Sequence, residues 1–313
     1  MQFPRFVTGL LVAFSLFAAS VAAASDVMFP PTSRVGLVPP KGMVASRSFQ
    51  GFEDADQKAA IVFAELPPQA YEQLEKAATA DAMKQPGLTL TGREPLAVDG
   101  GKAILLTAKQ ENGGTTIRKW LLVAAVSDLT VLASAEVPQA ASAAYPDAAI
   151  RAALQSVKVR PDPIAEKVEL LRFRVADLSG FRFVRAQPTS ALLTDGPQDD
   201  IDVAQPFMLI SIGAITAAQL AERDTFARES LRSIPGFIDV QVTSAEAQRI
   251  RGQAGYEVRA DAKNAKTGAD VTLVQWLRFS STSFLRMIGI VPKERWSEAF
   301  PRLRAIRDGV EPR

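Results

Sequence analysis

Two residue types that carry much of enzyme chemistry are missing from this sequence. It contains no histidine and no cysteine among its 313 residues. A histidine-ligated zinc site, a Ser-His-Asp triad, a thiol nucleophile and a disulfide bond are therefore all impossible. The motifs of P-loops, dinucleotide-binding loops and G-x-S-x-G hydrolases are also absent. We predict that the protein is not an enzyme, and the sequence indicates no catalytic residue and no cofactor.

One polar loop gathers carboxylates, which are the oxygen ligands that a hard cation such as Ca²⁺ prefers. Their spacing does not match an EF-hand, and the Gly196-Pro197 pair among them is typical of a solvated turn. We expect such a turn, with Glu53 to Asp56 as its counterpart in the first half of the chain. A hydrolase that uses two carboxylates stays an alternative, because such partners are often far apart in sequence. The candidate metal ligands are Asp195, Asp199, Asp200 and Asp202.

Trp120 and Trp276 are the next residues with a potential role. Each lies in a run of strand-forming residues, and each could contribute to a partner-binding surface or line a pocket. A tryptophan inside a strand more often fills the core, because its side chain buries a large apolar area. We therefore expect both to be core aromatics at equivalent strand positions.

The two tryptophans belong to a pattern that occurs twice. Each copy contains a Pro-Gly pair, a tryptophan and a later proline that follows an aromatic residue. From tryptophan to that proline the distance is 26 residues in one copy (146 − 120) and 25 in the other (301 − 276). From the Pro-Gly pair to the tryptophan it is 34 and then 41, a difference that a surface loop tolerates. The landmarks are Pro86-Gly87, Trp120 and Pro146 in the first copy, and Pro235-Gly236, Trp276 and Pro301 in the second.

The repeat predicts two similar domains, residues 25–160 and 161–313. They would contain 136 residues (160 − 24) and 153 residues (313 − 160), enough for each to bury its own core. Each half has short strands, an amphipathic helix, a four-strand meander and a closing helix. This order predicts an α+β fold, with helices packed on a largely antiparallel sheet.

Local signals support this arrangement of elements. The apolar run 60–64 predicts a strand, and the Asn-Gly step at residues 112–113 predicts a hairpin. We expect turns at residues 50–51 and 53–56. In the last helix, Pro301 should either produce a kink or begin the main part of the helix. The arginines that flank its apolar stripe are expected to face solvent, namely Arg295, Arg302, Arg304 and Arg307.

Residues 1–24 have the features of a signal peptide. Arg5 supplies the positive charge, residues 6–17 are largely apolar, and small residues precede a cleavage position before Ser25. An uncleaved anchor is the alternative, because residues 6–24 form a 19-residue stretch. We expect cleavage and a periplasmic or secreted protein. No other segment approaches membrane-spanning length, so we expect no membrane span after cleavage.

The charge balance bears on partners. The chain has 36 Lys and Arg against 34 Asp and Glu, a net charge of +2. Nucleic-acid binding requires a larger basic excess, so no nucleic-acid partner is predicted.

The order of elements resembles the PsbP-like fold, a group that includes exported bacterial proteins of the DcrB type. The resemblance depends on the glycine-hydrophobic entries Gly42-Met43 and Gly180-Phe181, the strand and helix that follow, and the Trp-bearing meander. It implies a tandem PsbP-like protein of the bacterial envelope, without catalytic residues. Members mostly bind or assist other proteins, so a non-enzymatic accessory module is the favoured function. A carrier of a small apolar ligand and a carboxylate-dependent hydrolase are the alternatives.

Overall fold

The computed structural model describes residues 26–78 and 87–313. The predicted leader and Pro86 of the first Pro-Gly landmark lie outside the described residues. The chain forms two compact units. The first contains Gly36–Val44 and Gly51–Lys158, and the second contains Val159–Arg313 together with Phe29–Val35 and Ala45–Gln50.

The first unit is built on a seven-stranded sheet whose neighbouring strands β3 to β8 pair antiparallel. Helix α1 (Ala70–Ala77) covers one face, where Tyr71 packs against Val123. Helix α2 (Asp147–Gln155) lies at the opposite face, toward which Trp120 points. The spatial order is β2 (Val44–Ala45), β3 (Gly51–Asp54), β4 (Ala59–Leu66), β8 (Leu129–Pro138), β7 (Thr115–Val126), β6 (Gly101–Asn112) and β5 (Leu88–Leu96).

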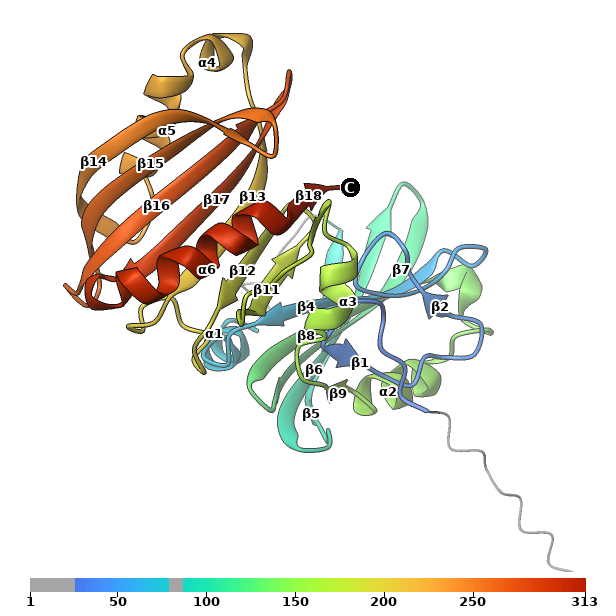
Figure 1. The fold of residues 1–313 in the computed structure, drawn as a ribbon. Coiled ribbons are helices and arrows are strands. Elements are labelled where there is room, and N and C mark those ends of the chain that lie inside the picture. Colours follow the sequence, from blue (N-terminus) through green and yellow to red (C-terminus); the bar gives the residue numbers. More distant parts are fainter. Residues whose placement is uncertain (1–25, 79–86) are drawn as a thin grey trace, which may run out of the picture. The chain divides into compact units, whose positions relative to one another are not determined.

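The second unit has a seven-stranded sheet of its own. Figure 1 shows helix α6 (Trp296–Gly309) crossing one face of this sheet, with α4 (Ala217–Ala221) and α5 (Arg223–Arg232) on the other. A short helix, α3 (Ile164–Glu169), precedes the sheet. The spatial order is β11 (Arg182–Gln187), β12 (Ser190–Thr194), β13 (Phe207–Ala214), β17 (Ser283–Pro292), β16 (Asp270–Phe279), β15 (Gln253–Asn264) and β14 (Phe237–Ile250).

The two sheets have the same strand order, position by position. Two short two-stranded pairs lie outside the sheets: β1 (Val35–Gly36) with β9 (Lys158–Val159), and β10 (Phe173–Val175) with β18 (Val310–Pro312). Each unit also has a 3₁₀ turn before its closing helix, η1 (Gln139–Ala141) and η2 (Lys293–Arg295). The chain thus has two similar α+β units, as the repeat predicted.

The glycines of the Pro-Gly landmarks have the same role in both units. Gly87 and Gly236 adopt φ of 77° and 85°, a left-handed conformation that glycine reaches without a steric penalty. The carbonyl of Gly87 accepts a hydrogen bond from the Glu111 amide, and that of Gly236 accepts one from the Ala265 amide, both at 2.9 Å. These bonds tie the start of each meander to the end of its second strand.

Strand geometry follows from the residue pattern. Along β4, Ala59, Ile61 and Phe63 are buried while alternate residues are more exposed, as expected for a strand with one core face. The predicted hairpin forms between β6 and β7 through Gly113 and Gly114, whose φ values of 56° and 82° suit a tight two-residue turn.

One local prediction is wrong in part: turns were expected at residues 50–51 and 53–56, but residues 51–54 form strand β3 and the turn follows at residues 55–58. Strand β2 ends at Ala45, because the Ser46 hydroxyl accepts a hydrogen bond from the Ser48 amide at 3.0 Å and bends the chain. Of the two alternatives for Pro301, the structure excludes a helix that begins there, because α6 starts at Trp296 directly after η2 and holds the proline inside.

No helix within residues 26–78 and 87–313 combines the length and the apolar character needed to cross a membrane.

Candidate functional site

The four candidate metal ligands have separate partners. Asp195 is buried, with its side chain 4% exposed, and its Oδ2 accepts from Arg302 at 2.8 Å and Arg295 at 3.1 Å. Asp202 forms an ion pair with Lys266 at 2.9 Å. The other contacts join Asp199 to Arg182 at 2.7 Å and Asp200 to the backbone amide of Asp202 at 3.0 Å.

These contacts organise the loop between β12 and β13. Within the described part of the chain, no three carboxylates gather in an arrangement that could hold a metal ion. The carboxylate of Asp195 instead fastens the end of β12 to the closing helix. The arginine partners Arg295 and Arg302 are about a third exposed, at 33% and 29%, so the cations reach toward solvent while the carboxylate does not.

Each unit contains such a fastening, which we call its corner pair. In the second unit the pair is Asp195 and Arg302. In the first it is Asp54, the last residue of β3, and Tyr145, whose hydroxyl donates to Asp54 Oδ2 at 2.6 Å. This hydrogen bond, together with backbone amides, lowers the pKa of Asp54 below its usual range. Burial, and then the contact with Asp54, raises the pKa of Tyr145.

A glycine lies against each corner pair. A Cβ added to Gly42 would lie 2.9 Å from the Tyr145 hydroxyl, and one added to Gly180 would lie 2.9 Å from Arg302 Nη2. Both glycines have positive φ, 101° and 80°. The glycine-hydrophobic entries of the sequence therefore mark where the first sheet strand approaches the closing helix.

The two tryptophans lie in the core of their units. Trp120 is 3% exposed and its Nε1 donates to Asp147 at 2.8 Å. Trp276 is fully buried and its Nε1 donates to Glu257 at 2.6 Å. Burial of the Glu257 carboxylate by itself raises its pKa, but hydrogen bonds from the Trp276 indole and from Arg259 outweigh this effect, so the pKa of Glu257 lies below its usual range.

The expected equivalence of the two tryptophans is wrong by two residues. Strand pairing places Ile117 opposite Pro138 in the first unit and Val271 opposite Pro292 in the second. Trp120 lies three residues beyond Ile117 (120 − 117), whereas Trp276 lies five residues beyond Val271 (276 − 271). A shift of two keeps the side chain on the same face of the sheet, so the core position changes but not the layer.

Aromatic and arginine side chains form a strip along α6 and the neighbouring β15. Trp296 and Phe300 stack with centroids 4.7 Å apart and planes at 25°, and Phe300 stacks on the buried Trp276 at 6.1 Å. The guanidinium groups of Arg259 and Arg304 lie 4.4 and 5.9 Å from the Phe300 centroid. We call Trp296, Phe300, Arg304 and Arg259 the α6 strip.

The α6 strip arises from helical spacing. Residues 296, 300 and 304 are four apart and so share one side of the helix. Trp296 and Phe300 are half-buried, while Leu303 and Ile306 are fully buried against the sheet. The prediction of solvated arginines holds for exposed Arg304 but is wrong for Arg307, which is 7% exposed and lies 5.3 Å from the Trp276 ring.

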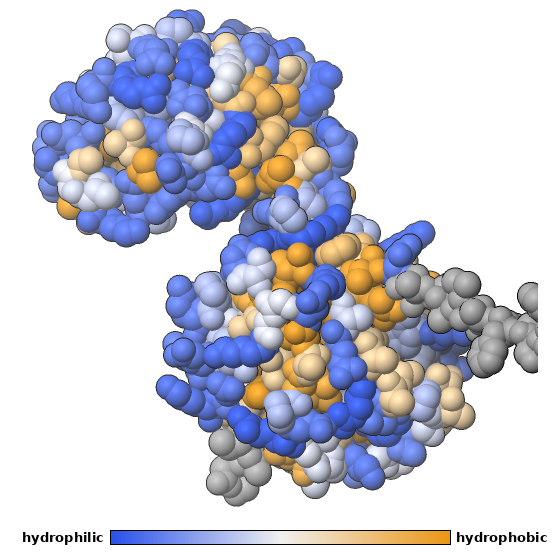
Figure 2. Space-filling model, turned by 90° about the horizontal axis from the view of Figure 1, so that it is seen from below, coloured by the Kyte–Doolittle hydropathy of each residue, from blue (hydrophilic) through white to orange (hydrophobic). Residues whose placement is uncertain are grey.

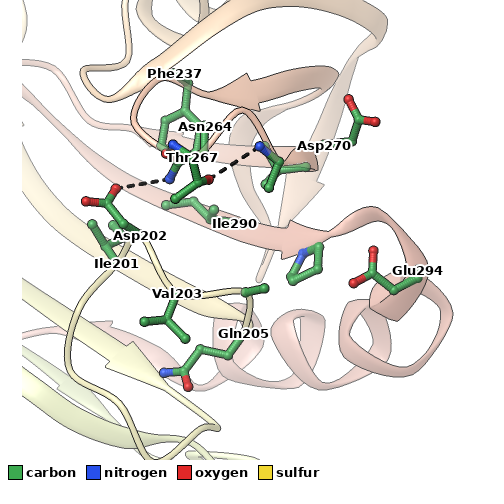
Figure 3. A pocket seen from close by; sticks show the side chains of 14 residues that line it. Ile201, Asp202, Val203, Gln205, Phe237, Asn264, Thr267, Asp270, Ile290 and Glu294 are labelled. Atoms are coloured by element: carbon green, nitrogen blue, oxygen red, sulfur yellow. Dashed lines mark hydrogen bonds between the residues drawn. The ribbon is translucent and has the colours of Figure 1, made fainter.

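A separate pocket of about 210 Å³ opens at one end of the second sheet (Figure 3). Its apolar walls come from the loop before β13, the start of β14 and the end of β17. Its polar rim comes from the same loop, the β15–β16 hairpin and η2. The apolar residues are Ile201, Val203, Phe237, Ile290 and Pro292, and the polar ones include Asp202, Asn264, Thr267, Asp270 and Glu294.

Sequence reasoning did not identify this pocket. Its residues come from four segments that are far apart in the chain, and none of those segments carries a motif. Asp202 is the only one of the candidate aspartates that lines it. Periodicity could indicate the strands but not which of their connecting loops meet at one end of the sheet.

Comparison with known proteins gives likenesses at low identity. No protein-family model matches the sequence, and no curated protein matches it. The chain is similar to the crystal structure of LpqN, described as involved in cell envelope biogenesis of Mycobacterium tuberculosis, with a TM-score of 0.35 and 14% identity over 44% of this chain and 81% of that chain.

Two further solved structures are similar to this chain. One is PsbP (CyanoP) from the cyanobacterium Synechocystis sp. PCC 6803, with a TM-score of 0.29 and 10% identity over 45% of this chain and 91% of that chain. The other is the immunity protein TplEi of T6SS from Pseudomonas aeruginosa, with a TM-score of 0.28 and 12% identity over 92% and 97%. With TM-scores this low, we draw no functional conclusion from these likenesses.

Proposed function

We propose that this protein is a non-enzymatic binding module of the bacterial envelope that engages another protein through the α6 strip. The observation that carries the proposal is the half-buried stack of Trp296 and Phe300 beneath the guanidinium groups of Arg259 and Arg304. Tryptophan and arginine are enriched among the residues that contribute most to protein–protein affinity.

The packing of the strip favours binding. Trp296 and Phe300 are stacked in a row that ends on a fully buried ring, so little side-chain freedom is left to lose on association. Arg259 donates a hydrogen bond to the Glu257 carboxylate at 2.8 Å. Arg304 lies against the Phe300 ring and forms no hydrogen bond or ion pair with the described residues, so its guanidinium remains available to an acceptor on a partner.

The alternatives receive less support from the geometry. A carrier of a small apolar ligand needs an apolar cavity, usually of about 300–1,000 Å³. The pocket of about 210 Å³ is smaller and has a charged rim, and two larger pockets, of about 450 and 460 Å³, are lined in part by charged side chains such as Lys167 and Arg249. A carboxylate-dependent hydrolase needs two available carboxylates that face each other. Glu257 accepts hydrogen bonds from the Trp276 indole and from Arg259. Asp195 is held by arginines through Oδ2, while its buried Oδ1 has no hydrogen-bond partner among the described residues, so at most one of these two buried carboxylates has an available oxygen.

The proposal also covers the export of the protein, its domain boundaries and its kinship. We propose a signal peptide at residues 1–24, export to the periplasm or beyond, and domains at 25–160 and 161–313. We also propose kinship with tandem PsbP-like proteins of the DcrB type. The shared strand order of the two units supports the duplication that such a protein requires.

The test uses the purified chain as bait for envelope proteins of the source bacterium. We expect a partner that the wild-type chain retains and that the Trp296→Ala, Arg304→Ala double variant loses. Ile238→Ala is the matched control, because Ile238 is also exposed on the second unit, at 48%, but belongs to β14 and not to the strip. Retention of every partner by the double variant would contradict the proposal.

A further inference from the structure

The pocket of Figure 3 has an unequal charge balance. Three carboxylates line it, and the ammonium groups nearby belong to the ion pairs Lys266–Asp202 at 2.9 Å and Lys263–Asp270 at 2.8 Å. Glu294 has no ion-pair or hydrogen-bond partner among the described residues. The lining thus has three carboxylates, of which two are ion-paired, and Lys293, the neighbour of Glu294 in η2, pairs with Asp261 at 3.2 Å instead.

The pocket is also preformed. Asn264 donates to Asp202 at 3.0 Å, and its side-chain oxygen accepts from the amides of Lys266 and Thr267, both at 2.9 Å. On the opposite wall, the buried amide of Gln205 donates to Thr194 at 2.8 Å. Both loops are thus held by internal hydrogen bonds, so a ligand need not pay to order them.

The walls and the rim differ in polarity. Val203, Ile290 and Pro292 give apolar surfaces, and Glu294 lies on the side of the lining away from Ile201 and Asp202 (Figure 3). An apolar slot that ends in a surplus negative charge is complementary to a cation on an apolar stem. A volume of about 210 Å³ suits one side chain or a small amphiphile rather than a drug-sized ligand.

We propose that this pocket binds an ammonium group carried on a short aliphatic stem, with the stem against Val203 and Ile290 and the ammonium at Glu294. A free alkylamine and a lysine side chain of a partner protein share this chemistry. The site is distinct from the α6 strip, so it does not depend on the function proposed above.

Nuclear magnetic resonance of the ¹⁵N-labelled full chain tests the proposal. Titration with n-pentylammonium should give saturable shifts at the amides of Thr267, Ala269 and Glu294, with a dissociation constant on the order of 1 mM. n-Pentanol, which has the stem without the charge, should bind at least about tenfold more weakly. Equal shifts with the alcohol, or no saturable shift with the amine, would overturn the proposal.

Two variants test whether Glu294 supplies the negative charge that binds the ammonium group. Glu294→Gln should weaken n-pentylammonium binding about tenfold, whereas Glu246→Gln, which removes an exposed carboxylate from β14, should leave it unchanged. Unaltered resonances elsewhere show that each variant is folded. The same affinity for wild type and Glu294→Gln would contradict the assignment.

A second ligand distinguishes the two sources of the ammonium group. Nα-acetyl-lysine N-methylamide presents the side chain as a partner protein would. Binding of this compound at the same amides supports a partner's lysine, while binding of n-pentylammonium alone supports a free amine. Binding of neither compound would refute both.

Discussion

The two units reach the same fold with different polar chemistry at the same corner. In the first, a tyrosine hydroxyl meets Asp54, and in the second a guanidinium meets Asp195. In both, an aspartate at the end of the second sheet strand is joined to the closing segment, and a glycine with positive φ makes room for the contact. The corner therefore specifies a geometry and an acceptor, while the donor can be neutral or charged.

The donors differ in rigidity. Tyr145 is 1% exposed and its ring is fixed by packing, whereas Arg302 is 29% exposed in its side chain and reaches the corner through a flexible stem. A donor that is fixed by packing cannot move aside when a neighbouring residue is enlarged. We therefore expect the first unit to be the more sensitive of the two to changes at its corner.

The largest effects should come from the tryptophans. Trp120→Ala and Trp276→Ala should each lower the free energy of unfolding by about 3–5 kcal/mol, because each leaves a large cavity. Trp276→Ala should lie at the upper end, since Trp276 also supports Phe300 and Arg307. Urea denaturation with hydrogen exchange resolved by unit measures both. A smaller loss for Trp276→Ala than for Trp120→Ala would reverse the comparison.

Substitution of Gly42 or Gly180 should have the next largest effect on stability, and the effect should differ between the two units. Alanine at either position must adopt a left-handed conformation, which costs about 1–2 kcal/mol. Gly42→Ala must also displace the fixed Tyr145 hydroxyl and should cost about 3 kcal/mol in total. Gly180→Ala meets only the end of Arg302 and should stay within about 1–2 kcal/mol. Equal losses in thermal unfolding would show that donor rigidity has no effect.

Loss of the buried carboxylate should have a smaller effect. Asp195→Asn should lower the free energy of unfolding by about 2 kcal/mol, less than for a fully buried pair because both arginines can turn to solvent. Asp199→Asn, in the same loop but 67% exposed in its side chain, should cost less than about 0.5 kcal/mol. Chemical denaturation of both variants decides whether the loss of unfolding free energy depends on burial of the carboxylate or on the charge of the loop.

The smallest effect should appear as a pH dependence. The folded pKa of Asp54 is lowered from 3.8, so its contribution to stability is present above about pH 4 and is lost as the pH falls through the folded pKa. Tyr145→Phe removes the main cause of the lowered pKa. The stability difference between wild type and Tyr145→Phe should be constant near neutral pH and should narrow below pH 4. A difference that stays constant down to pH 2 would show that the Tyr145 hydroxyl does not affect the pKa of Asp54.

The sequence predicts the repeat and its layers well, because these follow from hydrophobic periodicity and turn residues. Gly87 and Gly236 are found in matching conformations, and the hairpin at Gly113-Gly114 forms as its residues indicate. Strand β3 was missed because its acidic residues resemble a turn, yet pairing with β4 fixes them in the sheet. Tertiary pairing thus outweighs local preference there.

The corner pairs and the pocket were beyond the reach of the sequence for a different reason. Asp54 and Tyr145 are 91 residues apart, and Asp195 and Arg302 are 107 apart. The donors differ in type, so comparison of the two halves reveals no shared motif. Only the fold shows that Asp195, a candidate for metal binding, has the structural role of Asp54.

The central claim is that the two corner pairs are equivalent couplings, and double-mutant cycles test it most directly. One cycle combines Asp54→Asn with Tyr145→Phe, and the other combines Asp195→Asn with Arg302→Met, each followed by unfolding of the full chain. We expect both double variants to be less destabilised than the sum of their single variants, because the second change removes a contact already lost. Simple additivity in either cycle would contradict the claim.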